Sequence, residues 1–258
     1  MSKSWWNLLL FFFLGACAST STSGPEPEYN SSESALETYN RAMFEFNMQV
    51  NKNVLNPLAK GYKAITTQSI RNGVTNFFEN LKEPASMLNN LLQGNLADSG
   101  TSVGRFAVNS TVGLLGTFDV ASAWGIEKKE TGFDQTLAQY CVPDGPFIML
   151  PLVGPATPRY ITGFVADGFA SPTYWALINN DDPGVRAILW GSVGLKYLNI
   201  WAENLSLLEN LEAGSVDYYT TIKSAFLQHR EKFKSLCAPS DQNGQTSADY
   251  DFDFEEDF

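Results

Sequence analysis

Apolar residues recur at helical spacing along most of the chain and predict a succession of amphipathic helices. The first runs from Leu36 to Val54, with an apolar stripe through Met43, Phe46 and Val50, and Asn56-Pro57 is expected to end it. Three more follow. They are marked by Ile70, Val74, Phe77, Phe78 and Leu81, by Met87, Leu88, Leu91 and Leu92 after Pro84 and before Gly94, and by the stretch from Val103 to Leu115.

Helix start signals are clearer in the second half of the chain. Thr157-Pro158 and Ser171-Pro172 each place a capping hydroxyl before a first-turn proline. Asp182-Pro183 opens the longest candidate, which Gly214 ends, and Ser215 is expected to cap a last helix. Apolar residues cover more than half the circumference of the long helix, which is typical of a helix in a deep core or in lipid.

The segment from Gly104 to Arg159 is apolar but is repeatedly interrupted by glycine and proline. Such a segment must lie against other parts of the protein or against lipid, and it suggests a shaped passage or lip. Pro146 to Val153 is the best strand signal, and its prolines favour a hairpin or extended lip over a central strand. The remaining pattern predicts a mainly α protein with little or no sheet.

The N-terminus carries a targeting signal. Lys3 precedes a short apolar run that is too short to span a bilayer of about 30 Å, which predicts a signal peptide over residues 1–16. Leu14-Gly15-Ala16-Cys17 resembles a bacterial lipobox, so Cys17 is predicted to be lipidated, the alternative being an incidental cysteine. Residues 17–35 then form a flexible Ser/Thr/Pro/Glu-rich tether. The absence of aspartate after Cys17 favours, by resemblance, the outer membrane of a Gram-negative cell.

Composition excludes some partners. The formal net charge is −11, and no basic stripe exists to contact nucleic acid. Much of the acidic excess lies in residues 238–258, which are predicted to be a disordered tail or, alternatively, a short docking strand. Cys141 and Cys237 remain after Cys17, and a disulfide and two free thiols are both open.

Catalytic motifs have little support. Gly100-Thr101-Ser102-Val103-Gly104 matches a nucleophile elbow, and Asp119 and His229 follow in hydrolase order, but the expected preceding strand is missing. A serine hydrolase or lipase at Ser102 is therefore a remote alternative. Metal-binding and nucleotide-binding spacings are absent, so no cofactor and no metal are expected.

Several motifs, in order over about residues 36 to 235, resemble the MlaA (VacJ) family of outer-membrane lipoproteins. They are Asn40–Asn47 (NRAMFEFN), Arg71–Phe77 (RNGVTNF), Asn80–Pro84 (NLKEP), Asn90–Gly94 (NLLQG), Arg105-Phe106, Asn109–Thr111, Phe118–Ala121, Gln135–Leu137, Gly145–Phe147, Leu150-Pro151 and Gly154-Pro155.

The resemblance implies a single ring-like helical domain over residues 36–237, with amphipathic and interfacial helices, seated in the periplasmic leaflet of the outer membrane. It implies an amphipathic channel that removes mislocalised phospholipids from the outer leaflet and passes them to a periplasmic, MlaC-like lipid carrier, without enzymatic activity. It also implies a trimeric porin as partner. The rival interpretation is a structural lipoprotein that braces a porin or envelope complex without moving lipid.

Candidate site residues fall into two groups. Those predicted to line a lipid passage or lip are Phe147, Met149, Leu150, Pro151 and Arg159; ordinary core positions, and for Arg159 pairing with a carboxylate, are the alternatives. Those predicted to determine its shape are Asn47, Gly113, Gly116, Gly145 and Gly154.

Overall fold

The computed structural model describes residues 31–237, so the predicted signal peptide, Cys17, most of the tether and the acidic tail lie outside the described residues. The chain divides into two compact units, Met1–Ala35 and Leu36–Phe258. Of the first unit, only Ser31–Ala35 is described, as the opening turns of helix α1. All further description concerns the second unit.

The N-terminal helix is longer than the pattern predicts. Helix α1 (Ser31–Val50) passes through a π-helical turn, η2 (Asn51–Leu55), directly into α2 (Asn56–Ile65). The prediction that Asn56-Pro57 ends the helix is therefore wrong. Pro57 lies in the first turn of α2, after the π turn, where its missing N–H costs little.

The next helices follow the predicted order. Helix α3 (Gln68–Asn80) is capped by Thr67, and α4 (Glu83–Leu92) ends before Gly94 with φ +81°. The single-turn helix α6 (Val120–Ala123) was not predicted. Helix α5 (Leu96–Thr111) starts seven residues before the predicted Val103 and ends four before Leu115. Its internal glycines each weaken a helix by about 1 kcal/mol, and packing against α4 outweighs them.

The predicted hairpin is confirmed. After α7 (Phe133–Gln139), strands β1 (Ile148–Leu150) and β2 (Gly154–Ala156) pair antiparallel, with Met149 opposite Pro155. They form the only sheet within residues 31–237, so the predicted mainly α class is confirmed.

The C-terminal helices begin close to the predicted signals. Thr157 and Asp182 cap α8 (Pro158–Ala170) and α10 (Pro183–Gly214), whereas Ser171, before α9 (Pro172–Ile178), makes no side-chain capping bond. Asp217 rather than the predicted Ser215 caps α11 (Tyr218–Glu231). A carboxylate suits the positive end of the helix dipole better than a hydroxyl does. A 3₁₀ turn, η3 (Ser235–Cys237), follows.

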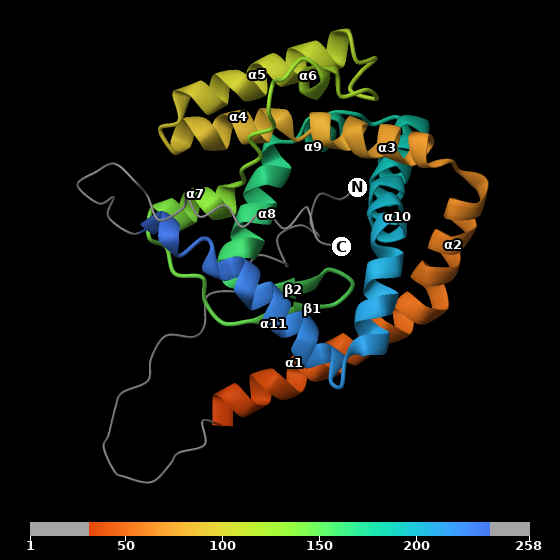
Figure 1. Cartoon of the computed structure of the whole chain (residues 1–258), viewed down its shortest axis with the longest axis vertical. Helices are drawn as coiled ribbons and strands as arrows, with labels where there is room; N and C mark the ends of the chain where they lie inside the picture. Colours follow the sequence, from red (N-terminus) through yellow and green to blue (C-terminus); the bar gives the residue numbers. More distant parts are fainter. Residues whose placement is uncertain (1–30, 238–258) are drawn as a thin grey trace, which may run out of the picture. The chain divides into compact units, whose positions relative to one another are not determined.

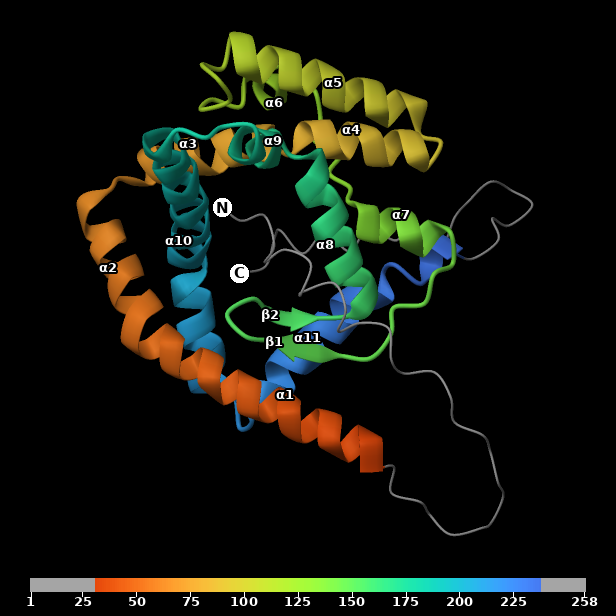
Figure 2. The same cartoon turned by 180° about the vertical axis from the view of Figure 1, so that it is seen from behind.

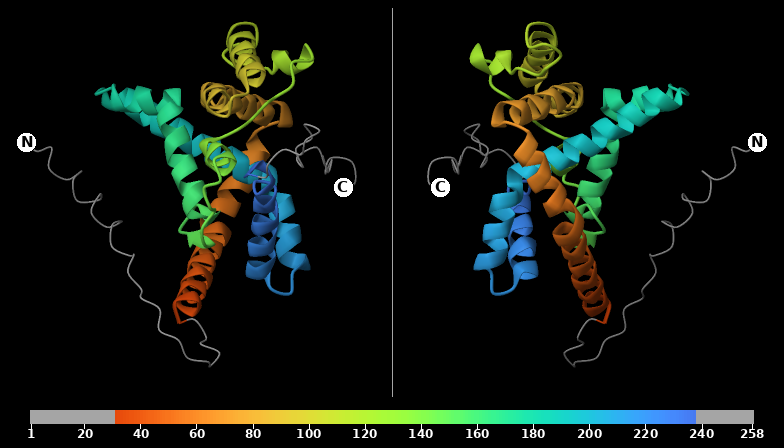
Figure 3. Two further views of the ribbon diagram at one scale, coloured as in Figure 1. Left: turned by 90° about the vertical axis from the view of Figure 1, so that its left-hand side faces the viewer. Right: turned by 90° about the vertical axis from the view of Figure 1, so that its right-hand side faces the viewer.

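Contacts within this unit close a circuit, the order expected of a ring-like arrangement. Helix α3 contacts α10, α10 contacts α11, and α11 contacts β2. Strand β2 leads into α8, which contacts α4, and α4 follows α3. Figures 1 and 2 show the elements succeeding one another in this order, with α5 on the outer side of α4. In the side views of Figure 3, the C-terminal end of α8, α9 and the start of α10 lie together, away from α11.

Candidate functional site

The distribution of polar and apolar side chains in the described unit is the reverse of that in an ordinary soluble domain. Among residues 31–237, buried polar side chains outnumber buried apolar ones, while many large apolar side chains are exposed. Asparagine, arginine and serine are common at fully buried positions, where a water-soluble protein places leucine and isoleucine. Exposed apolar surface on this scale marks an interaction site.

The helix pair α4–α5 shows this inversion clearly. Small and polar side chains, including Ser86, Asn89 and Ser102, are buried, and Ser99 Oγ donates to Met87 O over 3.1 Å. The large side chains that the pair exposes are all apolar: Leu88, Leu91, Leu92, Leu96 and Val103. Small residues between helices and leucines outside are the packing of helices surrounded by lipid. We call these five residues the α4–α5 apolar surface.

A second apolar surface covers α8, α9 and the first half of α10. Its exposed members, which we call the α8–α10 apolar surface, are Phe164, Val165, Phe169, Trp175, Ile178, Val185, Ile188, Trp190 and Leu195. At a rise of 1.5 Å per residue, the ten steps from Val185 to Leu195 span about 15 Å. This is about half the hydrocarbon thickness of a bilayer. No helix within residues 31–237 combines the length and apolarity needed to cross a membrane.

The turn after α5 displays further leucines. Leu114 and Leu115 are 65% and 71% exposed and both have positive φ, at 50° and 60°. A Cβ on Gly113 would lie 2.3 Å from Phe118 O, so only glycine fits there. Gly116 has φ +89° beside Asn80. The two glycines that the sequence singled out thus form the turn that holds Leu114 and Leu115 outward.

The inner face of α10 is polar where it meets α3. Asn199 is 1% exposed; its Nδ2 donates to Thr75 Oγ1 over 2.8 Å, and its Oδ1 accepts from Tyr62 OH over 2.8 Å. One turn later, Glu203 Oε1 pairs with Arg71 Nε at 2.6 Å. The helices run antiparallel at this contact, because rising numbers on α10 meet falling numbers on α3.

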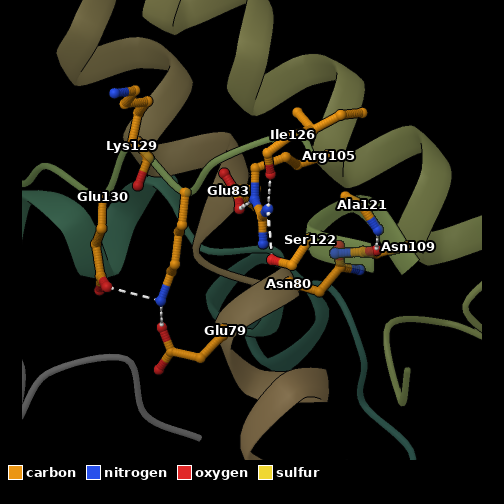
Figure 4. Close-up of polar contacts among 12 residues, drawn as sticks. Glu79, Asn80, Glu83, Arg105, Asn109, Ala121, Ser122, Ile126, Lys129 and Glu130 are labelled. Carbon is orange, nitrogen blue, oxygen red and sulfur yellow. Dashed lines mark hydrogen bonds and ion pairs between the residues drawn. The ribbon is translucent and has the colours of Figure 1, made fainter. Parts of the chain in front are cut away.

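The same register places Lys196, one turn before Asn199, toward the C-terminal end of α3. Two glutamates and two lysines form a closed set of ion pairs there. Lys82 Nζ lies 2.6 Å from Glu79 and 3.1 Å from Glu130, and Lys128 Nζ lies 2.5 Å and 2.8 Å from the same two carboxylates. Figure 4 shows Glu79 and Glu130, each joined by a dashed line to the ammonium that their ion pairs identify as Lys82.

Lys196 itself is half-buried and makes no hydrogen bond or ion pair with the residues that the structure describes. Burial, and then the ammonium of Lys82, lower the pKa of Lys196. The three lysines and two glutamates leave one positive charge in excess. We call these five residues, Glu79, Lys82, Lys128, Glu130 and Lys196, the lysine cluster.

Arg105 fastens α4, α5 and α6 together. Arg105 is 2% exposed, and its guanidinium donates to Glu83 over 2.9 Å and to both oxygens of Asp119 over 3.0 Å. It also donates to Ser122 Oγ over 3.1 Å and to Ile126 O, as Figure 4 shows. Burial acts to raise the pKa of Asp119, but hydrogen bonds from Ser122, Asn109 and Arg105 outweigh it and lower the pKa to about 2.

Arg159 lies in a second buried charge cluster rather than on a surface. Its Nε donates to Asp134 Oδ1 over 3.0 Å, which matches the alternative that Arg159 pairs with a carboxylate. Arg230 of α11 binds both Asp134 and Asp144, so the cluster joins α7, α8 and α11. Hydrogen bonds from Arg230 and Thr157 lower the pKa of Asp144 against the opposing effect of burial.

The hairpin is attached to α1 by two asparagines. Asn40 donates to Phe147 O over 3.1 Å and accepts from Met149 N over 2.7 Å. Asn47 donates to Leu150 O over 2.9 Å and accepts from Leu152 N over 2.7 Å. Each side-chain amide therefore replaces a strand partner.

The hairpin side chains divide between core and surface. Phe147 and Met149 are 7% and 1% exposed and pack with Tyr219, so their burial favours the core interpretation over contact with lipid. Leu150 is half-buried. The tip carries exposed Pro151 with Leu152 (67% exposed) and Val153 (58% exposed), and the last two are apolar residues that sequence reasoning missed.

Glycines shape both ends of the hairpin segment. Gly145 has φ +83° and lies against Pro158, where a Cβ would come within 2.9 Å of the ring. Gly154 has φ +95° and opens β2 after the tip.

The Gly100–Gly104 motif around Ser102 lacks the strand–turn–helix geometry of a nucleophile elbow. Ser102 lies in the middle of α5, fully buried, and its hydroxyl has no hydrogen-bond partner within residues 31–237. Asp119 is bound to Arg105, and His229 stacks edge-on against Phe233 at the end of α11. No group of histidine, cysteine and carboxylate side chains suited to a metal occurs among the described residues.

Comparison with known proteins identifies relatives over most of the chain. Residues 33–233 match the family model of the MlaA lipoprotein. The intermembrane phospholipid transport system lipoprotein MlaA of Haemophilus influenzae is 32% identical over 227 residues, covering 86% of each chain. The protein of the same name from Escherichia coli is 32% identical over 225 residues, covering 84% of this chain and 83% of its own.

A solved structure agrees with the sequence relatives. It is described as the structural basis for maintenance of bacterial outer membrane lipid asymmetry, and it covers 77% of this chain and 98% of its own. The TM-score is 0.62 at 30% sequence identity. Inverted side-chain burial, a helical circuit with one pinned hairpin, and these matches lead to one conclusion: the chain belongs to the MlaA lipoprotein family.

Proposed function

We propose that this protein is a non-enzymatic lipoprotein that removes mislocalised phospholipids from the outer leaflet of the outer membrane. It passes them through an amphipathic passage to a periplasmic lipid carrier and so maintains lipid asymmetry. The observation that carries the proposal is the inverted burial, with polar side chains inside and apolar ones outside. The relatives named for intermembrane phospholipid transport support the same substrate class.

Lipidation of Cys17 would anchor the chain, and the α8–α10 apolar surface would lie among acyl chains of the periplasmic leaflet. The length of its α10 portion, about 15 Å, suits one leaflet rather than a whole bilayer. Trp175 and Trp190, 53% and 60% exposed, are of the residue type that favours membrane interfaces.

A phospholipid needs a polar path for its head group and an apolar wall for its tails, because an unpaired charge in an apolar environment is costly. The lysine cluster offers the polar path for the head group, since its excess positive charge complements a lipid phosphate. Lys196 lies on the same helix as Ile188 and Trp190, so the head-group site and the acyl-chain surface adjoin. The lysine cluster would therefore meet the head group at the membrane-side entrance of the passage, next to the acyl chains that contact the α8–α10 apolar surface.

Two macromolecular partners complete the proposal. The α4–α5 apolar surface suits the lipid-facing wall of a trimeric porin, which is apolar at the same membrane depth. The periplasmic carrier would accept the lipid as it leaves the passage. A serine hydrolase has less support, because Ser102 is buried inside a helix.

The first experiment tests lipid movement in cells. Deleting the gene, or replacing Lys196 by glutamate, is expected to increase surface phospholipid, measured with a membrane-impermeant amine label. Lys196→Arg keeps the charge and should behave as wild type. Lys60→Glu, a charge reversal at an exposed residue paired with Glu209, is the matched control. A deletion strain with normal surface phospholipid would instead favour a structural brace for an envelope complex.

The second experiment tests membrane seating. Ile188→Asp places a carboxylate on the α8–α10 apolar surface, and a charge in a bilayer costs about 3 kcal/mol, or roughly a hundredfold in partitioning. We expect weaker binding of the unlipidated protein to phosphatidylethanolamine–phosphatidylglycerol vesicles. Val216→Asp, on the fully exposed α10–α11 turn, is the control. Equal binding of the two variants would place Ile188 away from lipid.

A further inference from the structure

Cys141 and Cys237, whose state the sequence leaves open, form a disulfide. The bond joins residues 96 apart, with a Cα–Cα distance of 5.0 Å. It connects the residue two positions after α7 to the last residue of η3. Both cysteines are exposed, so the bond lies within reach of another protein.

A non-covalent attachment joins the same two segments. Arg230, near the end of α11, binds Asp134 on α7 and Asp144 beyond it. Cys141 lies between these aspartates in the sequence, and Cys237 follows Arg230 by seven residues. Docking of α11 through Arg230 therefore brings the two sulfurs together, and the pairing depends on the folded chain.

The backbone at Cys141 indicates that the bond also restrains the chain. Cys141 has φ +59°, in the left-handed region that a residue with a Cβ rarely adopts. Backbone hydrogen bonds from Cys141 N to Ala138 O and from Val142 N to Leu137 O end α7 in this conformation. The covalent link to η3 then opposes its relaxation.

We propose that Cys141 and Cys237 are a substrate site for a thiol–disulfide oxidoreductase, and that their bond is a clasp holding the C-terminal end of α11 on α7. The clasp goes beyond the proposed function, because it concerns how the chain is closed and not what passes through it. The partner is a protein with a reactive, exposed disulfide.

The chemistry balances between the two proteins. One cysteine loses its proton, and its thiolate attacks a sulfur of the partner's disulfide, releasing one partner thiolate and forming a mixed disulfide. The second cysteine, also deprotonated, attacks the sulfur of the first and releases the other partner thiolate. Two electrons and two protons thus pass to the partner, whose disulfide becomes a dithiol.

The test uses the full chain, purified in detergent after secretion, with Cys17 present in every variant. Mass-tagged maleimide should add two more tags per chain after reduction with dithiothreitol than before it. The same chain from a host lacking its secreted thiol oxidase should carry both tags without reduction. Free thiols at 141 and 237 in wild-type protein from the normal host, or full oxidation without the oxidase, would contradict the substrate assignment.

Limited trypsin digestion tests the clasp. Reduction of the folded wild type should speed cleavage after Arg230, Lys232 and Lys234 by at least about tenfold, because cleavage follows the population of the locally open state. Cys237→Ser should show the fast rate without reductant, and the double variant with Cys141→Ser should not respond to reductant. If cleavage of oxidised and reduced wild type proceeds equally fast, the bond is not a clasp. Since wild type alone gives that comparison, the test holds even if the variants fold poorly.

Discussion

The Arg105–Asp119 contact gives a quantitative prediction about acid stability. Asp119 accepts hydrogen bonds from Arg105, Asn109 and Ser122, and its pKa falls from 3.8 to about 2. A depressed pKa means that folding stabilises the charged carboxylate. The difference corresponds to about 2 kcal/mol of stability, present above pH 4 and lost as the pH falls toward 2. Asp119 is 30% exposed, which makes this an upper value.

Asp119→Asn removes the charge while keeping the size of the side chain. We expect the free energy of unfolding of the variant to lie about 2 kcal/mol below wild type at pH 7, and the gap to shrink by most of that amount at pH 2. The assay is urea unfolding of the full chain in detergent, followed by tryptophan fluorescence at pH 7, 5, 3 and 2.

The matched control is Asp181→Asn, at an exposed aspartate before α10. It should change stability by less than about 0.5 kcal/mol at every pH. Other carboxylates titrate in all three proteins, so the test compares the difference in the free energy of unfolding between each variant and wild type at each pH. A gap for Asp119→Asn that is independent of pH would refute the electrostatic account of this contact.

Three further predictions follow from packing. Met149→Ala should lower the free energy of unfolding, measured in urea, by about 2–5 kcal/mol, because it leaves a cavity beside Tyr219. Leu152→Ala, at the exposed tip, should lower it by less than about 0.5 kcal/mol. Equal losses in the two variants would contradict the assigned burial. Asn40→Ala should lower the free energy of unfolding by about 2–3 kcal/mol and speed amide hydrogen exchange at Met149, because it leaves two buried backbone groups of the hairpin unpaired. Unchanged exchange would show that Asn40 does not attach the hairpin to α1. Gly113→Ala should lower the melting temperature by several degrees, because its Cβ would clash with Phe118 O, and an unchanged midpoint in calorimetry would show that the turn can adjust.

Most of the longer helices could be predicted from the sequence, because their start and stop signals are local. Thr157-Pro158 and Asp182-Pro183 give capping oxygens and first-turn prolines that need no distant partner, and the helices begin at both. The proline-interrupted segment from Pro146 to Val153 contains β1 and the turn before β2, as predicted. Local reasoning was wrong at Pro57, where a π turn carries the helix onward, and at Ser215, where a nearby carboxylate caps α11 instead.

Which face of each helix points outward, and which polar residues meet, became clear from the folded arrangement alone. An amphipathic period is the same whether its apolar side is buried or faces lipid, so the pattern could not assign Leu91 to the surface or Asn89 to the interior. Arg230 binds Asp134, which is 96 residues away in the sequence, and Asn199 binds Tyr62, which is 137 residues away. Such pairs depend on how the helices pack around the ring-like arrangement, which residue spacing within a single helix cannot predict.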